Sequence, residues 1–494
     1  MKKLSIVCAS ALLMSINLVG CGDDDDNPNG PTGGTKSDGG EASAGKTGKA
    51  GSGGTAGTAP STTGGAGEGG GAAIVPCDIY GDRPIKVIPA DADGNITATV
   101  LTADTVWSLN DRLFVPAGKT LTIEPCTRIE GTPKPNAGSL FVMQGAKLEA
   151  AGTADAPILF TSEDHAFSDT PWGGVVLLGN APIGPKVADE ERPVRIYEGM
   201  TDERASYGGD DPEDSSGTLQ YIRIEFGGDI IVTEPAAKEI NGLSFGAVGR
   251  KTVVDHIMVK DQADDCFEWF GGTVNADHLI SQNSGDDMFD TDEGFKGHLQ
   301  YLFGRNLVEG SSSDPNGFEW DGNQPLLTAP AEALGIPQAS NATLCGFKES
   351  SKVSYGAVLR RSLGEGTLIQ NSIITGFNFG VDARDNVGTT DAPLISWTNS
   401  LFFEQVTADG AATDDDDAKD GAFDENAWLA ASDDTVGGDA PAGFDCYAAD
   451  GPTAPTAVID GATPGSGFDK KGTFVGAFGD ENWATGAWVD WSYE

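Results

Sequence analysis

Basic residues are scarce in this chain. Its 494 residues include 31 Lys and Arg against 75 Asp and Glu, which gives a formal net charge of −44 at pH 7. A protein that binds nucleic acid by neutralising phosphates needs clustered basic side chains. Docking on anionic lipid headgroups has the same requirement. The composition therefore excludes nucleic acid as a partner and argues against binding to an anionic membrane surface.

Long apolar runs and several familiar motifs are also missing. No segment after residue 20 is apolar over the roughly 20 residues that a bilayer span needs. No Cys-x-x-Cys spacing occurs, so thiolate zinc sites and thioredoxin-like chemistry are not expected. No Gly-x-Ser-x-Gly, P-loop or dinucleotide fingerprint stands between a strand and a helix as its chemistry requires. Helical periodicity is scarce, and residues 331–334 are the one modest helical candidate.

The first 20 residues have the pattern of a signal peptide. Lys2 and Lys3 precede a short apolar stretch, which is too short for a transmembrane helix. The sequence Leu18-Val19-Gly20-Cys21 follows and resembles a bacterial lipobox. The resemblance implies cleavage before Cys21 and lipidation of its thiol. An ordinary signal peptide with a chance cysteine is the alternative.

Residues 21–75 are predicted to be the lipidated cysteine and a flexible linker. They are rich in Gly, Ser, Thr and Ala and contain no aromatic residue, so they cannot bury enough apolar surface to fold. Gly22 follows the cysteine, and in the lipoprotein sorting rules that this resembles, it favours the outer membrane. The acidic run 23–26 resembles a signal for display on the outer leaflet, and a solvated acidic tail is its alternative. We expect an exported protein with a lipid anchor in the outer membrane, exposed on the cell surface.

Five cysteines remain after Cys8 and Cys21 are set aside. An exported domain permits disulfides, and an odd number leaves one thiol over. The expected pairs are Cys77 with Cys126 and Cys345 with Cys446. Cys266 lies in a regular strand pattern, where a small apolar side chain packs well.

Short β-rich runs separated by Gly, Asn, Asp and Pro follow from Cys77 onward, and one motif recurs among them. His256 and His278 are 22 residues apart, as are Asp265 and Asp287. A degenerate third copy, residues 316–320, arrives late, as it would after an inserted loop near residues 310–314. A period near 22 suits one turn of a parallel β-helix, in which successive turns share a core.

The opening motif, residues 113–125, resembles the first turns of right-handed parallel β-helix surface proteins. Residues 172–179 resemble a later turn of the same family, and the resemblance covers about residues 100–405. The repeated Asp-Asp-x-Phe-[Asp/Glu] turns resemble a group of exported bacterial lipoproteins of no established activity. We predict a right-handed parallel β-helix over residues 76–405. An acidic insertion and a C-terminal cap follow over 406–494, where Trp483, Trp488 and Trp491 would cover the last turn.

The recurring acidic residues are the one candidate site. Equivalent positions on successive turns lie ~4.8 Å apart, so like charges in register repel unless something offsets them. A calcium ion could do so, with carboxylates as ligands. The candidate calcium ligands are Asp264, Asp265, Asp286, Asp287, Asp290 and Asp292.

Two other interpretations of these residues stay open. Asp265, Asp286 and Asp287 could be general acid and base for polysaccharide cleavage. The tripeptide 285–287 resembles the Gly-Asp-Asp of polygalacturonase-like hydrolases, but the Gly-His-Gly and Arg-x-Lys of that family are absent. A lyase would need a basic residue near the carboxylates, and nothing in the sequence brings Arg250, Lys251, Arg360 or Arg361 there. Alternatively, the Asp pairs only form solvated corners.

The in-phase aromatic and histidine residues carry less weight. Phe267, Phe289 and Phe318 predict an internal aromatic stack, and Trp269 and Trp320 are expected in the core. No cysteine is placed to join His256 and His278, so no histidine metal site is expected.

The functional hypothesis is a non-catalytic surface lipoprotein stiffened by calcium. It would act in adhesion, in binding an extracellular glycan or matrix, or as a surface-layer component. The alternative is a polysaccharide hydrolase or lyase that uses the stacked Asp residues.

Overall fold

The structure is a computed structural model, and part of the chain is described in it. The described residues are 77–133, 137–167, 171–184, 193–232, 238–323, 334–385, 387–404 and 423–492. The predicted signal peptide, Cys21 and linker lie outside the described residues, as does most of the helical candidate at 331–334. Within the described part, no helix is long and apolar enough to cross a membrane.

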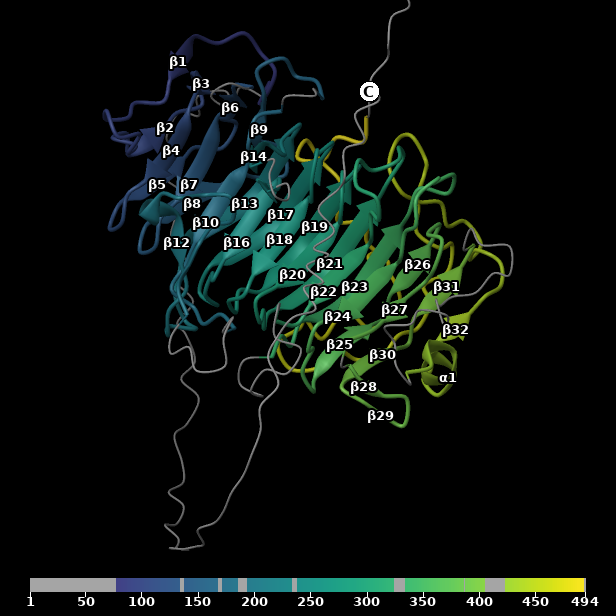
Figure 1. The fold of residues 1–494 in the computed structure, drawn as a ribbon. Helices are drawn as coiled ribbons and strands as arrows, with labels where there is room; N and C mark the ends of the chain where they lie inside the picture. Colours follow the sequence, from purple (N-terminus) through teal and green to yellow (C-terminus); the bar gives the residue numbers. More distant parts are fainter. Residues whose placement is uncertain are drawn as a thin grey trace, which may run out of the picture. The chain divides into compact units, whose positions relative to one another are not determined.

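The fold is a right-handed parallel β-helix, as predicted, built around two long parallel sheets (Figure 1). The larger sheet contains β1 (Ile85–Val87), β2 (Val100–Leu101), β3 (Val106–Leu109), β5 (Thr120–Ile123), β6 (Arg128–Gly131), β8 (Lys147–Ala151), β9 (Ile158–Ser162), β13 (Gly217–Glu225), β17 (Val253–Lys260), β19 (Ala276–Gln282), β21 (His298–Arg305), β23 (Gln338–Cys345), β25 (Thr367–Gln370), β26 (Ile373–Thr375), β30 (Ile395–Thr398), β31 (Leu401–Phe403) and β32 (Thr435–Val436). The smaller sheet contains β4 (Arg112–Val115), β7 (Ser139–Val142), β10 (Val175–Leu178), β16 (Leu243–Gly246), β18 (Phe267–Phe270), β20 (Phe289–Asp292), β22 (Phe318–Asp321), β24 (Ala357–Arg360) and β27 (Asp382–Ala383).

Short elements lie outside these sheets. Three antiparallel pairs are β11 (Arg195–Ile196) with β12 (Ser206–Tyr207), β14 (Ile230–Val232) with β15 (Lys238–Glu239), and β28 (Gly388–Thr389) with β29 (Ala392–Pro393). The helical elements are a 3₁₀ turn, Glu203–Ala205, and the short helix α1, Glu425–Ala430.

The 22-residue repeat is one turn of the β-helix. In the larger sheet, β17 pairs with β19 and places Ile257 beside Leu279. In the smaller sheet, Phe267 of β18 pairs with Phe289 of β20, which pairs with Phe318 of β22. The third copy of the motif is therefore in register, and the extra residues before it form the loop between β21 and β22.

The inward side chains form one continuous core. The rings of Phe267 and Phe289 stack with centroids 5.4 Å apart, and those of Phe289 and Phe318 lie 5.9 Å apart. Trp269 and Trp320 are also fully buried in this core. The predicted internal stack is confirmed, and neither tryptophan is available to bind a sugar.

The structure contains both expected disulfides. Cys77 is bonded to Cys126, and Cys345 is bonded to Cys446. Cys266 is a free, buried cysteine in the core.

The predicted role of the C-terminal tryptophans was wrong. The apolar side chains that join the core at its C-terminal end are Trp428 and Leu429 of α1 and Phe423, two residues before the helix. Trp488 instead belongs to a cluster on the outer face of the larger sheet that includes Met258 and Phe303, and its ring contacts Tyr221 and His256. The segment continues back to an early turn, where Ala487 N donates to Ala154 O at 2.8 Å. These outward apolar side chains need cover from water, and the tryptophan segment provides it.

Candidate functional site

The strand pairing brings acidic residues of three turns together on the outer face of the smaller sheet. Side chains alternate along a strand, so the inward Phe267, Phe289 and Phe318 leave their successors pointing outward. Glu268 consequently lies in register with Asp290, and Asp290 with Glu319. We call these three residues, together with Asp264, Asp265, Asp286 and Asp287, the acidic cluster.

Two groups within this cluster have the spacing of metal ligands. Carboxylate oxygens of Asp264, Asp265 and Asp286 lie within 4.8 Å of one another. Those of Asp265, Glu268 and Asp290 do the same. Asp265 belongs to both groups, so they form one continuous patch of carboxylates.

The cluster is more buried than solvated corners would be. Exposed fractions are 7% for Asp265, 7% for Glu268 and 4% for Asp287. The loop between β21 and β22 packs against the two Asp-Asp turns, where Ser311 Oγ donates to Ala263 O at 2.7 Å. The interpretation of the Asp pairs as fully solvated corners was therefore wrong. The loop between β21 and β22, which is long only in the third copy of the motif, covers these Asp pairs.

The second Asp of each pair has a structural task. Asp265 Oδ1 accepts a hydrogen bond from Asp287 N at 2.8 Å, and Asp287 Oδ1 accepts one from Asn316 N at 2.7 Å. Asn316 Oδ1 continues the series by accepting from Tyr355 N at 3.0 Å. The position therefore needs a side-chain oxygen, and an asparagine serves as well as an aspartate.

Burial and mutual repulsion disfavour ionisation in the cluster. Burial raises the pKa of Asp265 well above its usual value, and the carboxylates of Asp264 and Asp287 raise it further. Burial also raises the pKa of Glu268 and of Asp290. Asp290 Oδ1 is buried and has no hydrogen-bond partner among the described residues. The cluster therefore favours a proton or a cation.

Arginines close one end of the cluster, which the sequence did not reveal. Arg360 Nε donates to Asp321 Oδ1 at 2.7 Å, and Arg360 Nη2 donates to Glu319 Oε1. Arg361 Nη1 donates to Asp321 Oδ2. Burial lowers the pKa of Arg360, but Asp321 and Glu319 outweigh this effect and raise it well above its ordinary value. Arg360 is thus a permanent cation held between two carboxylates.

The predicted ligands and catalytic residues divide in three ways. Asp264, Asp265, Asp286 and Asp290 lie in the two groups, and Asp287 is beside them in the ladder of backbone acceptors. Asp292 is two residues from Asp290 on β20 and belongs to neither group. Glu268 was missing from the predicted ligands, although its recurrence in phase with Asp290 was a signal for it.

A second cluster lies on the larger sheet, where the long strands bend. The residue at each bend has a left-handed backbone: Tyr221, His256, His278, Tyr301 and Asn341, with φ between 49° and 59°. The four rings stack from turn to turn, with centroids 4.5 Å apart for Tyr221 and His256, 4.2 Å for the two histidines and 4.7 Å for His278 and Tyr301. We call these four residues the corner ladder.

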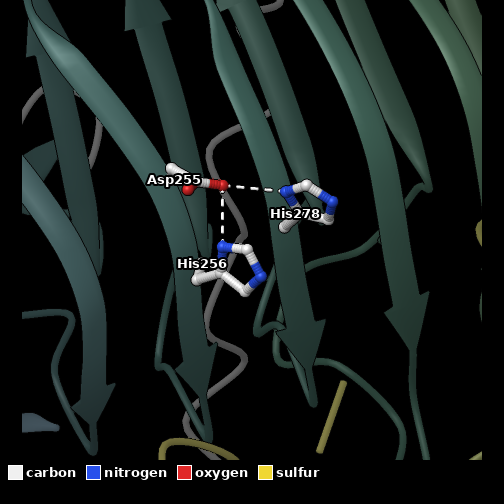
Figure 2. A group of neighbouring side chains, drawn as sticks. All are labelled: Asp255, His256 and His278. Atoms are coloured by element: carbon white, nitrogen blue, oxygen red, sulfur yellow. Dashed lines mark hydrogen bonds and ion pairs between the residues drawn. The ribbon is translucent and has the colours of Figure 1, made fainter. Parts of the chain in front are cut away.

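Asp255 joins the two histidines of the corner ladder. Its Oδ1 lies 2.8 Å from the Nδ1 of His256 on β17 and 2.8 Å from the Nδ1 of His278 on β19 (Figure 2). Burial raises the pKa of Asp255, but the bonds from His256 and His278 outweigh it and hold the pKa well below its usual value. The repeated Asp-His dipeptides at 255–256 and 277–278 were the signal for this group.

The architecture defines the class of this protein, a right-handed parallel β-helix, here with a charged outer face on its smaller sheet. The family model described as "Pectate-lyase like beta helix domain" matches residues 94–444, and the chain belongs to that family. No curated protein and no solved structure matches the chain.

Proposed function

We propose that this protein is a non-catalytic surface β-helix protein whose acidic cluster binds calcium, and that it acts in adhesion or in binding an extracellular glycan or matrix. The observation that carries the proposal is the burial of Asp265, Glu268 and Asp287 in contact with further carboxylates. Carboxylates that are buried and contact one another stabilise the fold, whereas carboxylates that cleave a polysaccharide must be accessible to it.

Calcium suits this cluster because it prefers oxygen ligands, with carboxylates prominent among them. The oxygens of Asp265, Glu268 and Asp290 are close enough to share one ion. A cation there would offset the repulsion between ionised carboxylates and take up the unpartnered Asp290 Oδ1. These residues therefore fit the ion, and its role would be structural.

Polysaccharide cleavage is the second candidate, because Arg360 stands at the end of the carboxylate row, as a lyase would require. Two features weigh against it. A base must lose its proton near the working pH, and the raised pKa of Arg360 prevents that. Hydrolases hold their two carboxyl groups at least ~5 Å apart, with the substrate between them, whereas oxygens of the candidates Asp265 and Asp286 lie within 4.8 Å.

Export and anchoring are part of the proposal. The two disulfides support an oxidising compartment. Lipidation at Cys21 and placement in the outer membrane rest on the lipobox resemblance alone. They can be tested by labelling with a radioactive fatty acid, which a Cys21→Ser variant should not incorporate.

The deciding experiment is a thermal melt of the full chain in chelator and then in millimolar calcium. A ligand that binds only the folded state raises the unfolding midpoint by mass action, and we expect a rise of several degrees. Asp290→Asn should abolish that rise, while the exposed Asp155→Asn, with the same change of charge, should keep it. An unchanged midpoint in the wild type would contradict calcium binding. Release of sugar from any of a broad panel of polysaccharides, lost in Asp287→Asn, would favour the enzyme instead.

A further inference from the structure

We propose that Asp255, His256 and His278 form a binding site for one divalent transition-metal ion, with Zn²⁺ as the ion of choice. This site lies on the larger sheet, apart from the acidic cluster, and the inference goes beyond the proposed function. Imidazole nitrogens with one carboxylate oxygen are a donor set typical of Zn²⁺, Cu²⁺ and Ni²⁺.

The three donor atoms already converge. Figure 2 shows both imidazoles directed at the same carboxylate oxygen, and each Nδ1 is 2.8 Å from Asp255 Oδ1. The three ligand atoms lie within 4.8 Å of one another. Zn²⁺ binds nitrogen and oxygen ligands at about 2.0–2.2 Å, so donors around one ion are ~3 Å apart. An ion that replaces the two ring protons therefore needs little movement of the side chains.

Neighbouring groups hold the donors in place. Gln220 Nε2 donates to the other carboxylate oxygen, Asp255 Oδ2, at 3.3 Å. Tyr221 and Tyr301 stack on the outer sides of the two imidazoles. Such outer-shell contacts orient ligands and strengthen metal binding.

An ion can reach this site, and the surrounding charge favours it. The side chains of Asp255, His256 and His278 are 27%, 15% and 23% exposed. Asp277 is in register beside Asp255 on the next turn; burial and the carboxylate of Asp255 raise its pKa to about 7, so it carries a partial negative charge at neutral pH. Trp483 and Trp488 pack edge-on against the imidazoles and leave the group only partly covered.

The bend of the strands does not by itself require histidine. Asn341, Asn371 and Asn399 have the same left-handed backbone on later turns, and asparagine tolerates this conformation well. His256→Asn and His278→Asn should therefore fold while losing a ligand. His165→Asn is a matched control because His165 is also left-handed (φ 52°) and pairs with Glu130, outside this site.

The test is a titration of the full chain with Zn²⁺ by isothermal calorimetry, with imidazole NMR signals followed in parallel. We expect one Zn²⁺ to bind and to shift the signals of His256 and His278. His278→Asn and Asp255→Asn should each weaken binding more than tenfold, and Gln220→Ala about tenfold. His165→Asn and Asp290→Asn should leave the affinity unchanged.

Three results would overturn the inference. The first is a wild-type chain that binds no Zn²⁺ up to millimolar concentration. The second is a His256→Asn/His278→Asn double variant that binds as tightly as the wild type. The third concerns Asp290. If Asp290→Asn alone removes Zn²⁺ binding, the ion occupies the acidic cluster, which refutes this site and leaves the proposed calcium role standing.

Discussion

The corner ladder and the acidic cluster are built from the same turns of the β-helix, yet they manage charge in opposite ways. On the larger sheet, the carboxylate of Asp255 meets two imidazoles from adjacent turns. On the smaller sheet, Glu268 lies beside the carboxylates of Asp265 and Asp290 and accepts a hydrogen bond from the amide of Asn241. Because the turns repeat, similar side chains stack on one another. A charged side chain is therefore stable only where a residue at another position of the repeat supplies its partner.

The difference appears in the protonation of the two regions. The histidines hold the pKa of Asp255 below its usual value despite its burial, whereas burial raises the pKa of Asp265 and its neighbours. The carboxylate of Asp255 can therefore remain ionised beside the corner ladder. The acidic cluster needs protons, a cation or the arginines at its end.

The largest expected effect is a pH dependence of stability. The folded cluster binds protons more tightly than the unfolded chain does, because several of its pKa values are raised above the ordinary 3.8 of Asp and 4.5 of Glu. This stabilisation is complete below those ordinary values and is lost as the pH rises through the raised ones. In chelator, the thermal unfolding midpoint should therefore decrease as the pH is raised from 5 to 8. Calcium should make this decrease smaller.

The lowered pKa of Asp255 predicts a pH dependence of stability with the opposite sign. Its lowered pKa stabilises the fold above about pH 4, and that contribution is lost as the pH falls further. Asp255→Asn should thus lower the midpoint at pH 5, whereas Asp290→Asn should flatten the slope between pH 5 and pH 8. Equal slopes in the wild type and in Asp290→Asn would remove the distinction between the regions.

The next effect concerns Arg360. It is the partner that offsets the charge of Glu319 and Asp321, as the two histidines are the partners of Asp255. Arg360→Met should destabilise the fold by about 3–5 kcal/mol, because it leaves Glu319 without its cation and the buried Asp321 with Arg361 alone. Arg250→Met breaks an exposed pair with Glu213 and should cost no more than ~1 kcal/mol. Denaturant titration measures both. Equal losses would mean that Arg360 is not the counter-ion of the cluster.

The smallest effect is expected at Asp287, where two substitutions distinguish the contribution of the negative charge to stability from that of the hydrogen bond. Asp287→Ala removes the acceptor for Asn316 N and should cost about 1–3 kcal/mol. Asp287→Asn keeps an acceptor oxygen, as Asn316 does on the next turn, and relieves repulsion, so its stability in chelator should equal or exceed that of the wild type. A large loss in Asp287→Asn as well would show that the negative charge is required.

Much of the scaffold could be predicted from periodicity. The 22-residue spacing placed Phe267, Phe289 and Phe318 on one inward column, and their register follows from the stacking of turns. The same spacing puts Glu268 and Asp290 at equivalent positions of successive turns, and the two are in register. The fate of the C-terminal tryptophans could not be predicted in this way, because Trp488 contacts Tyr221 and His256 far away in the sequence.

The sequence by itself determined the repeat, the parallel β-helix and the columns in which acidic and histidine residues would recur. These follow from local alternation of side chains and a constant number of residues per turn. Only the tertiary structure decided that a loop buries the Asp pairs, that Arg360 closes their row and that Asp255 joins His256 to His278. Burial and partners at these positions depend on segments that the repeat does not encode, and burial is what separates a solvated corner from a site that favours a cation.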